Sequence, residues 1–174
     1  MKSLATLRTT KVKNGFSLIE IITVLFVVSL GLVGLLSLII QNIQSQSYNK
    51  DNLIAYQLAQ EGAELVRKVR DSNWRSAPLP FTIILHSGYY YMDYNDSALQ
   101  IYNSNNADAT ILRQDANGFY THDLSATTPS SGFSRLITIT TGLYGSVDVK
   151  VTVSWSANTR NYHYDLETSL YNWK

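Results

Sequence analysis

Cysteine is absent from this chain of 174 residues, and its absence removes several kinds of chemistry. Without a thiol there is no cysteine nucleophile, no thiolate metal site and no disulfide to close a loop. The absence does not fix the compartment, because a secreted domain of this size need not carry a disulfide. Once a long N-terminal helix is set aside, roughly 100 residues remain, which suffices for one small domain with its own core.

Basic charge is scarce outside the N-terminus. The first 15 residues hold four cations and no acid, and the remaining residues hold ten bases against 13 acids. The four cations are Lys2, Arg8, Lys11 and Lys13. Proteins that bind nucleic acid need a basic face that displaces counterions. The mildly acidic body therefore argues against nucleic acid as a specific partner.

Motifs for catalysis and for metal binding are also lacking. The three histidines have no ligand spacing, and the chain contains neither a nucleophile elbow nor a phosphate loop. Residues 93–97 begin like a calcium loop, but Ala98 replaces the required glycine and Ser104 the required glutamate, which excludes an EF-hand. A looser cation site there, or at Asp115 and Asn117, stays open. We expect no enzymatic activity, no cofactor and no metal.

Charge of either sign is missing from Ile21 to Ile40, a run of 20 residues. At about 1.5 Å per residue, a helix of this length spans roughly 30 Å, the thickness of a bilayer's hydrocarbon core. The four preceding cations favour an N-terminus held in the cytoplasm. The run therefore predicts a single pass through the cytoplasmic membrane, with the rest of the chain outside.

Two ordinary membrane segments are the alternatives. A secretory signal has an apolar run of about 7–15 residues before a small-x-small cleavage site; here the run is longer and residues 41–45 offer no such site. An uncleaved anchor explains everything except Glu20, an ionisable residue at the edge of the run. A carboxylate costs about 2.5–3.5 kcal/mol at the membrane centre and less near the headgroups. We expect Glu20 either to snorkel or to have a partner.

The residues before the apolar run form a recognisable motif. Gly15-Phe16-Ser17-Leu18-Ile19-Glu20, after a short basic leader, resembles the processing site of type IV prepilins and pseudopilins. The match covers the glycine at the cut, the phenylalanine after it and the glutamate fifth from the cut. The resemblance implies that a prepilin peptidase/methyltransferase cuts between Gly15 and Phe16 and then methylates Phe16. It also implies other pilin subunits as partners, with the membrane holding the chain before assembly.

The resemblance gives Glu20 a role that its chemistry supports. Cleavage leaves a positive amine on Phe16, and this amine can pair with the Glu20 carboxylate within one chain or between neighbours. An unpaired carboxylate in a low-dielectric filament core is penalised, so pairing would select the register of each incoming subunit. One departure stands out: many pilins have a proline midway along this helix, whereas here the first proline is Pro78.

Helical periodicity continues beyond the apolar run, over residues 41–73. An apolar stripe recurs at spacings of three and four, which predicts an amphipathic helix lying on a soluble domain. The stripe consists of Ile54, Ala55, Leu58, Ala59, Gly62, Leu65, Val66 and Val69. A basic cluster, Arg67, Lys68 and Arg70, suits a last turn better than a phosphate site, and residues 71–73 read as a stop. The segment 57–62 resembles PilV-like minor pilins, the type IV pilus modification group.

Residues 74–174 predict an antiparallel β-domain. Apolar and polar residues alternate over 147–155 and 162–170, and 136–141 is rich in β-branched residues, so three strands joined by short turns form a meander. Weaker signals predict short strands at 81–85, 89–94 and 99–102, a polar loop at 103–108, and turns at 115–118 and 127–132. Ten of the 12 tyrosines lie between Tyr89 and Tyr171, where they fill strand faces or bind ligands by stacking.

Together these patterns predict an α+β, pilin-like fold: a leader (1–15), a transmembrane and polymerisation helix (16–40), its amphipathic continuation (41–73), and a globular antiparallel β-domain (74–174). The expected function is that of a structural subunit, a minor pilin, in an extracellular type IV pilus-like filament. A pseudopilin of a secretion or competence machine shares the same N-terminus and stays open. So does an anchored extracytoplasmic binding module that never polymerises.

Overall fold

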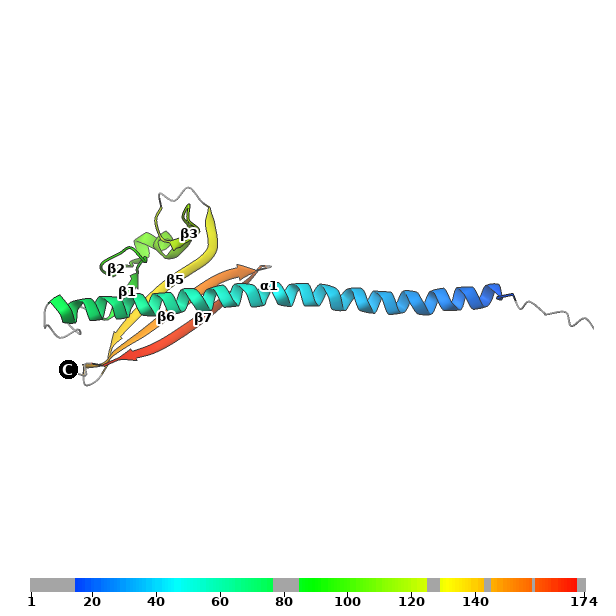
Figure 1. Cartoon of the computed structure of the whole chain (residues 1–174), viewed down its shortest axis with the longest axis horizontal. Helices are drawn as coiled ribbons and strands as arrows, with labels where there is room; N and C mark the ends of the chain where they lie inside the picture. The colour runs from blue at the N-terminus through cyan, green and yellow to red at the C-terminus, as the bar shows by residue number, and fades with distance from the viewer. Residues whose placement is uncertain (1–14, 77–84, 125–128, 143–144, 158, 172–174) are drawn as a thin grey trace, which may run out of the picture. The chain divides into compact units, whose positions relative to one another are not determined.

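The computed structural model describes residues 15–76, 85–124, 129–142, 145–157 and 159–171 (Figure 1). One long helix precedes an antiparallel sheet, which confirms the predicted α+β class. The elements in chain order are α1 (Leu18–Ser76), β1 (Gly88–Tyr91), β2 (Gln100–Ile101), the 3₁₀ helix η2 (Ser104–Thr110), β3 (Ile111–Gln114), β4 (Tyr120–Thr121), β5 (Ser130–Thr141), β6 (Val147–Ala157) and β7 (Arg160–Leu170).

Helix α1 belongs to two compact units, one ending at Ser45 and one beginning at Gln46. The helix runs through the predicted stop at residues 71–73 and ends at Ser76. Asn73 does not break it, because its side-chain amide donates to the Val69 carbonyl at 3.0 Å. Asparagine that bonds back to position i−4 is satisfied inside a helix, so the local stop signal was misread.

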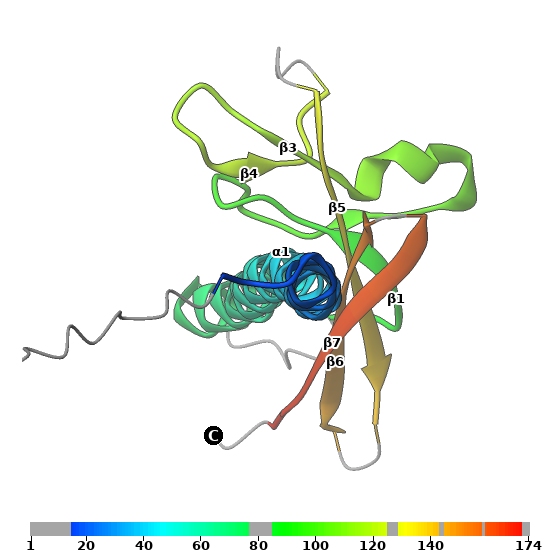
Figure 2. The ribbon, with the colours of Figure 1, turned by 90° about the vertical axis from the view of Figure 1, so that its right-hand side faces the viewer.

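Strand β5 is the centre of the sheet (Figure 2). Along one side it pairs with β6 from Phe133 to Thr141, and β6 pairs with β7 along its whole length. The opposite side of β5 is shared by two short strands: β3 pairs near Ser134 and β1 pairs at 137–139. The predicted meander is therefore confirmed as β5–β6–β7, and the layer of residues 88–121 is attached to the other side of β5.

The core lies between the second-unit part of α1 and the inner face of the sheet. The predicted stripe is buried there, with Ala55, Ala59 and Val66 fully inaccessible to solvent. The alternation predicted for β6 is also confirmed: Val147, Val149, Val151, Val153 and Trp155 are buried, and their neighbours are not. Each aliphatic side chain buried in this way contributes about 1.5–3 kcal/mol, so the helix and the meander stabilise each other.

Gly62 allows α1 to approach the sheet closely. A Cβ added at this position would lie 2.8 Å from Val151 Cγ1 and 3.3 Å from Arg135 Cδ. We expect Gly62→Leu to lower the free energy of unfolding by about 1–3 kcal/mol, because neither neighbour can move without disturbing the core. Urea unfolding in detergent micelles, followed by tryptophan fluorescence, measures the effect. The control Gln57→Leu, on the exposed face of the same helix, should change stability by less than about 0.5 kcal/mol.

The segment that follows α1 and precedes β5 in the sequence departs most from the sequence prediction. Strand β1 overlaps the predicted 89–94 segment and β2 lies within the predicted 99–102 segment, but β3 and β4 were not predicted. The predicted loop at 103–108 is largely η2, and the predicted strand at 81–85 lies mostly outside the described residues. Strands of two to four residues are too short to show a period of two, which explains why β3 and β4 were not predicted.

Candidate functional site

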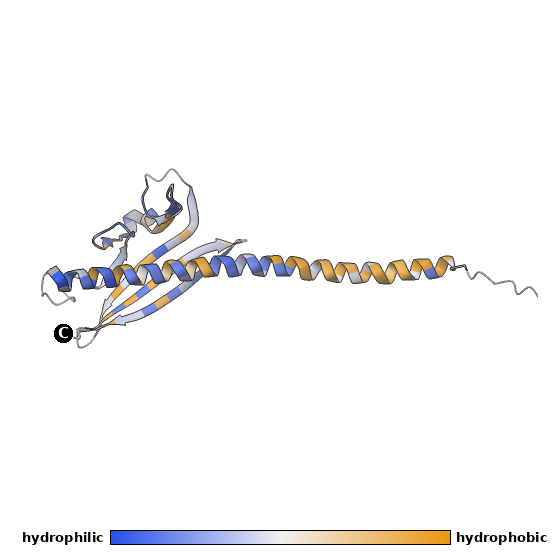
Figure 3. Ribbon diagram, viewed as in Figure 1, coloured by the Kyte–Doolittle hydropathy of each residue, from blue (hydrophilic) through white to orange (hydrophobic). Residues whose placement is uncertain are grey.

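The first unit presents an uncovered apolar helix surface, visible as the continuous orange stretch in Figure 3. An 18-residue window there has a mean hydropathy of 2.7 and no buried residues. Its large apolar side chains from Phe16 to Ile43 are between 51% and 79% exposed. The helix is thus long and apolar enough to cross a membrane, judged by length and composition. An apolar surface of this extent requires a cover of lipid or of other helices.

Phe16 lies two residues before α1 begins, and Glu20 lies in the first turn of that helix. The backbone N–H groups of Glu20 and Ile21 donate to the Ser17 carbonyl at 3.0 and 3.2 Å, which begins the helix immediately after Phe16. Phe16 and Glu20 line one shallow hollow of about 250 Å³ together with Ile21, Val24 and Leu25. The side chains of Phe16 and Glu20 therefore border the same hollow, whose lining is apolar. The carboxylate also lies in the first turn, where the helix dipole favours negative charge.

The hydroxyl groups of the apolar helix satisfy themselves within it. Thr23 donates to the Ile19 and Glu20 carbonyls at 3.0 and 2.9 Å, and Ser29 and Ser37 donate to carbonyls three and four residues earlier. Such bonds allow a hydroxyl to enter a bilayer without an unsatisfied polar group. Added Cβ atoms at Gly31 and Gly34 would meet nothing within 4 Å. From residue 21 to residue 40, the helix surface therefore carries only apolar side chains and hydroxyl groups that are bonded within the helix.

The basic cluster near the end of α1 is engaged within the protein. Arg67 pairs with Glu64 and lies 3.4 Å from the Thr168 hydroxyl. Lys68 Nζ donates to the carbonyls of Tyr94 and Asp96 at 3.2 Å each. Arg70 Nε lies 2.9 Å from the Asp71 carboxylate, with its guanidinium 4.9 Å from the Trp74 ring centroid. These contacts favour the helix-end reading over a phosphate-binding patch.

A buried ionic cluster, which sequence reasoning missed, joins α1 to the sheet. Arg135 on β5 is fully buried and donates to the carbonyls of Leu58 and Met92 at 3.3 and 2.8 Å. Its guanidinium lies 3.2 Å from Glu61 Oε2 and 3.9 Å from Asp93 Oδ1. A charge taken fully out of water needs such partners. Arg135 therefore fastens the helix, β5 and the 92–93 turn to one another.

Asp93 completes this cluster from the other side. Its carboxylate accepts the Thr121 hydroxyl at 2.8 Å and the His122 backbone N–H, and it pairs with the His122 ring. Burial raises the pKa of Asp93, but hydrogen bonds and charge from His122, with the Thr121 bond, outweigh it, so the pKa lies below its usual range. The supposed calcium loop is therefore a turn tied to β4 and to the residue that follows it.

The decrease in the free energy of unfolding at acid pH should depend on Asp93. Its folded pKa is below the ordinary 3.8, so the unfolded chain binds a proton first as pH falls. The stability from ionised Asp93 is complete above about pH 4 and is lost as pH drops through the folded pKa. Urea unfolding at several pH values should give Asp93→Asn a shallower slope below pH 4. Arg160→Gln, an exposed charge change, should keep the wild-type slope, and an unchanged slope in Asp93→Asn would contradict this assignment.

At the other candidate cation site, one carboxylate oxygen of Asp115 is bound by the protein's own backbone. Asp115 Oδ1 accepts the backbone N–H of Asn117 at 2.8 Å and of Phe119 at 2.9 Å, in an Asx-type turn. His86 and His163 are exposed, whereas His122 is buried. Within the described ranges, no group of three or more His, Cys, Asp or Glu side chains is placed to hold a metal ion.

In comparisons with known proteins, no family model, no curated protein and no solved structure matches the chain. Its function must therefore be argued from its own residues. Two features carry that argument: the uncovered apolar helix that begins with Phe16 and Glu20, and the sheet domain that is fastened to the continuation of that helix.

Proposed function

We propose that the chain is a structural subunit, a minor pilin, of a type IV pilus-like filament. The observation that carries the proposal is the helix surface from Phe16 to Ile43, which nothing covers within the described chain. Its length and composition suit a lipid bilayer before assembly. Packing against the same helices of neighbouring subunits would replace the lipid after assembly. The same helix surface would thus contact lipid before assembly and neighbouring subunits after it.

The resemblance of residues 15–20 to a prepilin processing site supports this proposal. Cleavage after Gly15 would free an amine on Phe16, four residues before Glu20 in the sequence. Their pairing in a dry helical bundle would favour the register that brings an amine and a carboxylate together. The four cations of the leader would orient the precursor with its N-terminus in the cytoplasm. The sheet domain would then be displayed outside, first on the membrane and then along the filament.

The N-terminus of the mature protein tests the proposal directly. We expect intact-mass and N-terminal peptide analysis to show a chain that begins at N-methylated Phe16. The variant Gly15→Leu should keep the leader, because a branched side chain at the cut removes the glycine that defines the site. Gly31→Leu, further along the same helix, should be processed normally. A mature chain that still begins at Met1, or that is cut after Ile40, would refute the proposal.

Two other functions predict different outcomes. A pseudopilin would share the methylated Phe16 but would be found in a short envelope structure rather than in sheared surface filaments. An anchored binding module would lack N-methylation and would remain entirely in the membrane fraction. Cross-linking through single cysteines placed on the apolar helix separates the binding module from both filament subunits, since only a polymerising chain would give a ladder of oligomers. The cysteine-free sequence makes these placements clean.

A further inference from the structure

Two exposed aromatic rings meet on the layer attached to β5. Tyr94 is 44% exposed and Phe119 is 57% exposed, and their ring centroids lie 5.4 Å apart at an interplanar angle of 40°. Tyr94 belongs to the turn after β1, whereas Phe119 precedes β4, so the pair forms by tertiary packing. Large exposed aromatic rings gathered in one place are characteristic of recognition surfaces.

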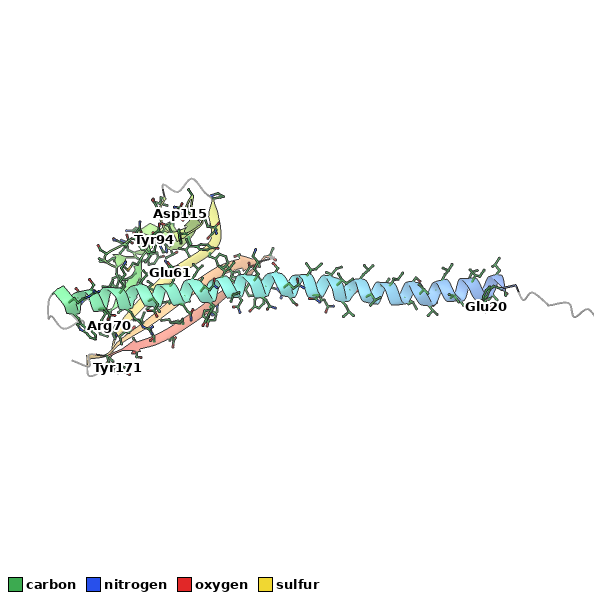
Figure 4. The ribbon with its side chains drawn as sticks, in the orientation of Figure 1. Glu20, Glu61, Arg70, Tyr94, Asp115 and Tyr171 are labelled. Carbon is green, nitrogen blue, oxygen red and sulfur yellow. The ribbon has the colours of Figure 1, made fainter. Side chains whose placement is uncertain are left out.

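Asp115 joins the two rings and holds Phe119 in place. Its Oδ2 accepts the Tyr94 hydroxyl at 3.3 Å, while its Oδ1 accepts the Phe119 backbone N–H. The turn closes further through Asp115 N–H to the Phe119 carbonyl at 2.9 Å, with Gly118 at a φ of +86°. A left-handed φ of this kind suits glycine. Tyr94 and Asp115 are seen close together in Figure 4.

Tyr94 is held from the opposite side by its own turn. Lys68 donates to its carbonyl, the Asp96 N–H donates to the Asp93 carbonyl at 3.1 Å, and the Asp93 carboxylate is tied to residues 121 and 122. Both rings therefore stand on turns that are already fixed. A fixed surface loses little conformational entropy when it binds a partner, which is the advantage of rigid aromatic contacts.

Asp115 places a negative charge beside the two rings, whereas the nearby Lys68 ammonium is bound to the carbonyls of Tyr94 and Asp96. Asp115 makes no ion pair with any described lysine, arginine or histidine, and the bond from Phe119 N–H, followed by the Asn117 and Tyr94 bonds, lowers its pKa despite partial desolvation. Desolvation, followed by the charges of Asp115 and Asp93, raises the pKa of Tyr94. An aromatic face beside an unpaired carboxylate attracts a cation through both the ring quadrupole and direct charge.

We propose that Tyr94, Phe119 and Asp115 form a binding site for an arginine or lysine side chain presented by another protein. Arginine fits best, because its planar guanidinium stacks on a ring while its edge donates to a carboxylate. The free lone pair of Asp115 Oδ2 supplies that acceptor. The site does not depend on polymerisation, and it gives the sheet domain a partner chemistry that the proposed function leaves open.

The test uses the full chain in detergent micelles, with ¹³C-labelled tyrosine and phenylalanine rings. A peptide with one arginine, acetyl-Gly-Arg-Gly-amide, should shift the Tyr94 and Phe119 ring signals with a dissociation constant on the order of 1 mM. The isosteric citrulline peptide, which has no charge, should bind at least about tenfold more weakly. Added salt should weaken only the arginine peptide, because the attraction is partly electrostatic.

Variants assign the binding to this site. Asp115→Asn retains an oxygen for the turn but removes the charge, so we expect arginine affinity to fall about fivefold while the citrulline value is unchanged. Tyr94→Ala should abolish the shift of Phe119. The control Tyr89→Ala removes another exposed tyrosine and should leave affinity unchanged. Equal binding of the two peptides, ring shifts caused by a neutral sugar instead, or no shift up to about 20 mM peptide would overturn the proposal.

Discussion

Replacing Glu20 by alanine should abolish incorporation of the chain into filaments while leaving processing after Gly15 largely intact. The peptidase would act on the residues at the cut, whereas Glu20 lies a full helical turn beyond it on the exposed face. Without the carboxylate, the Phe16 amine would enter a dry helical bundle unpaired. Leaving one charge of a buried pair without its partner costs about 3–5 kcal/mol, which corresponds to at least a 10²-fold loss in assembly.

The measurement is the amount of each variant in sheared surface filaments, compared with the amount in the membrane. Glu20→Lys should fail in the same way, because it places two positive charges together. The control Glu64→Ala removes an exposed carboxylate from the same helix and should incorporate normally. Filaments that contain Glu20→Ala at wild-type levels would exclude a role for Glu20 in selecting the register.

Loss of the Arg135 side chain is expected to have the largest effect on the stability of the sheet domain. Arg135→Ala would remove a donor from the carbonyls of Leu58 and Met92, remove the partner of Glu61 and open a cavity beneath Gly62. We expect the free energy of unfolding to fall by about 3–5 kcal/mol. Glu61→Gln should cost less, because the Glu61 side chain is 35% exposed and water already shares its charge.

Urea unfolding in detergent micelles, followed by the fluorescence of buried Trp155, measures this loss. Arg67→Ala is the matched control: its pair with Glu64 is exposed and should contribute no more than about 1 kcal/mol. Arg135→Met retains the aliphatic stem and separates packing from charge. If Arg135→Ala unfolded at the same urea concentration as Arg67→Ala, the buried cluster would not hold the domain together.

Local periodicity explains which parts of the fold were predictable. The apolar run, the helical stripe around Leu58 and the alternation in β6 each repeat over enough residues to reveal their structure. The buried cluster has no such pattern, because Glu61, Asp93 and Arg135 are far apart in sequence and meet only after folding. A lone arginine flanked by strand residues was the single available signal, and it does not identify a partner.

The same limitation explains why the sequence left two cation sites open, although 115–118 was also predicted as a turn. Asp93 and Asp115 were candidate cation ligands because acidic residues next to asparagine are spaced as in calcium loops. In the structure these carboxylates accept backbone N–H groups and hydroxyls of their own chain. An Asx-type turn and a cation loop place oxygen atoms at the same short spacings, so composition alone cannot separate them. The motif at residues 15–20, by contrast, is contiguous, so the sequence alone can assign roles to Phe16 and Glu20, and these roles stay predictions.

The side of β5 that β1 and β3 share has a consequence for the evolution of the sequence. The helix and the β5–β6–β7 meander form one framework, and residues 88–121 pair with its backbone only along one side of β5, through two short strands. Side chains of Lys68 and Arg135 add contacts to this layer. Insertions and replacements in residues 88–121 therefore leave the backbone pairing of the framework intact, provided that the Asp93 carboxylate still contacts the Arg135 guanidinium. If the chain forms filaments as proposed, exchange of this layer would give one scaffold a succession of different outer surfaces.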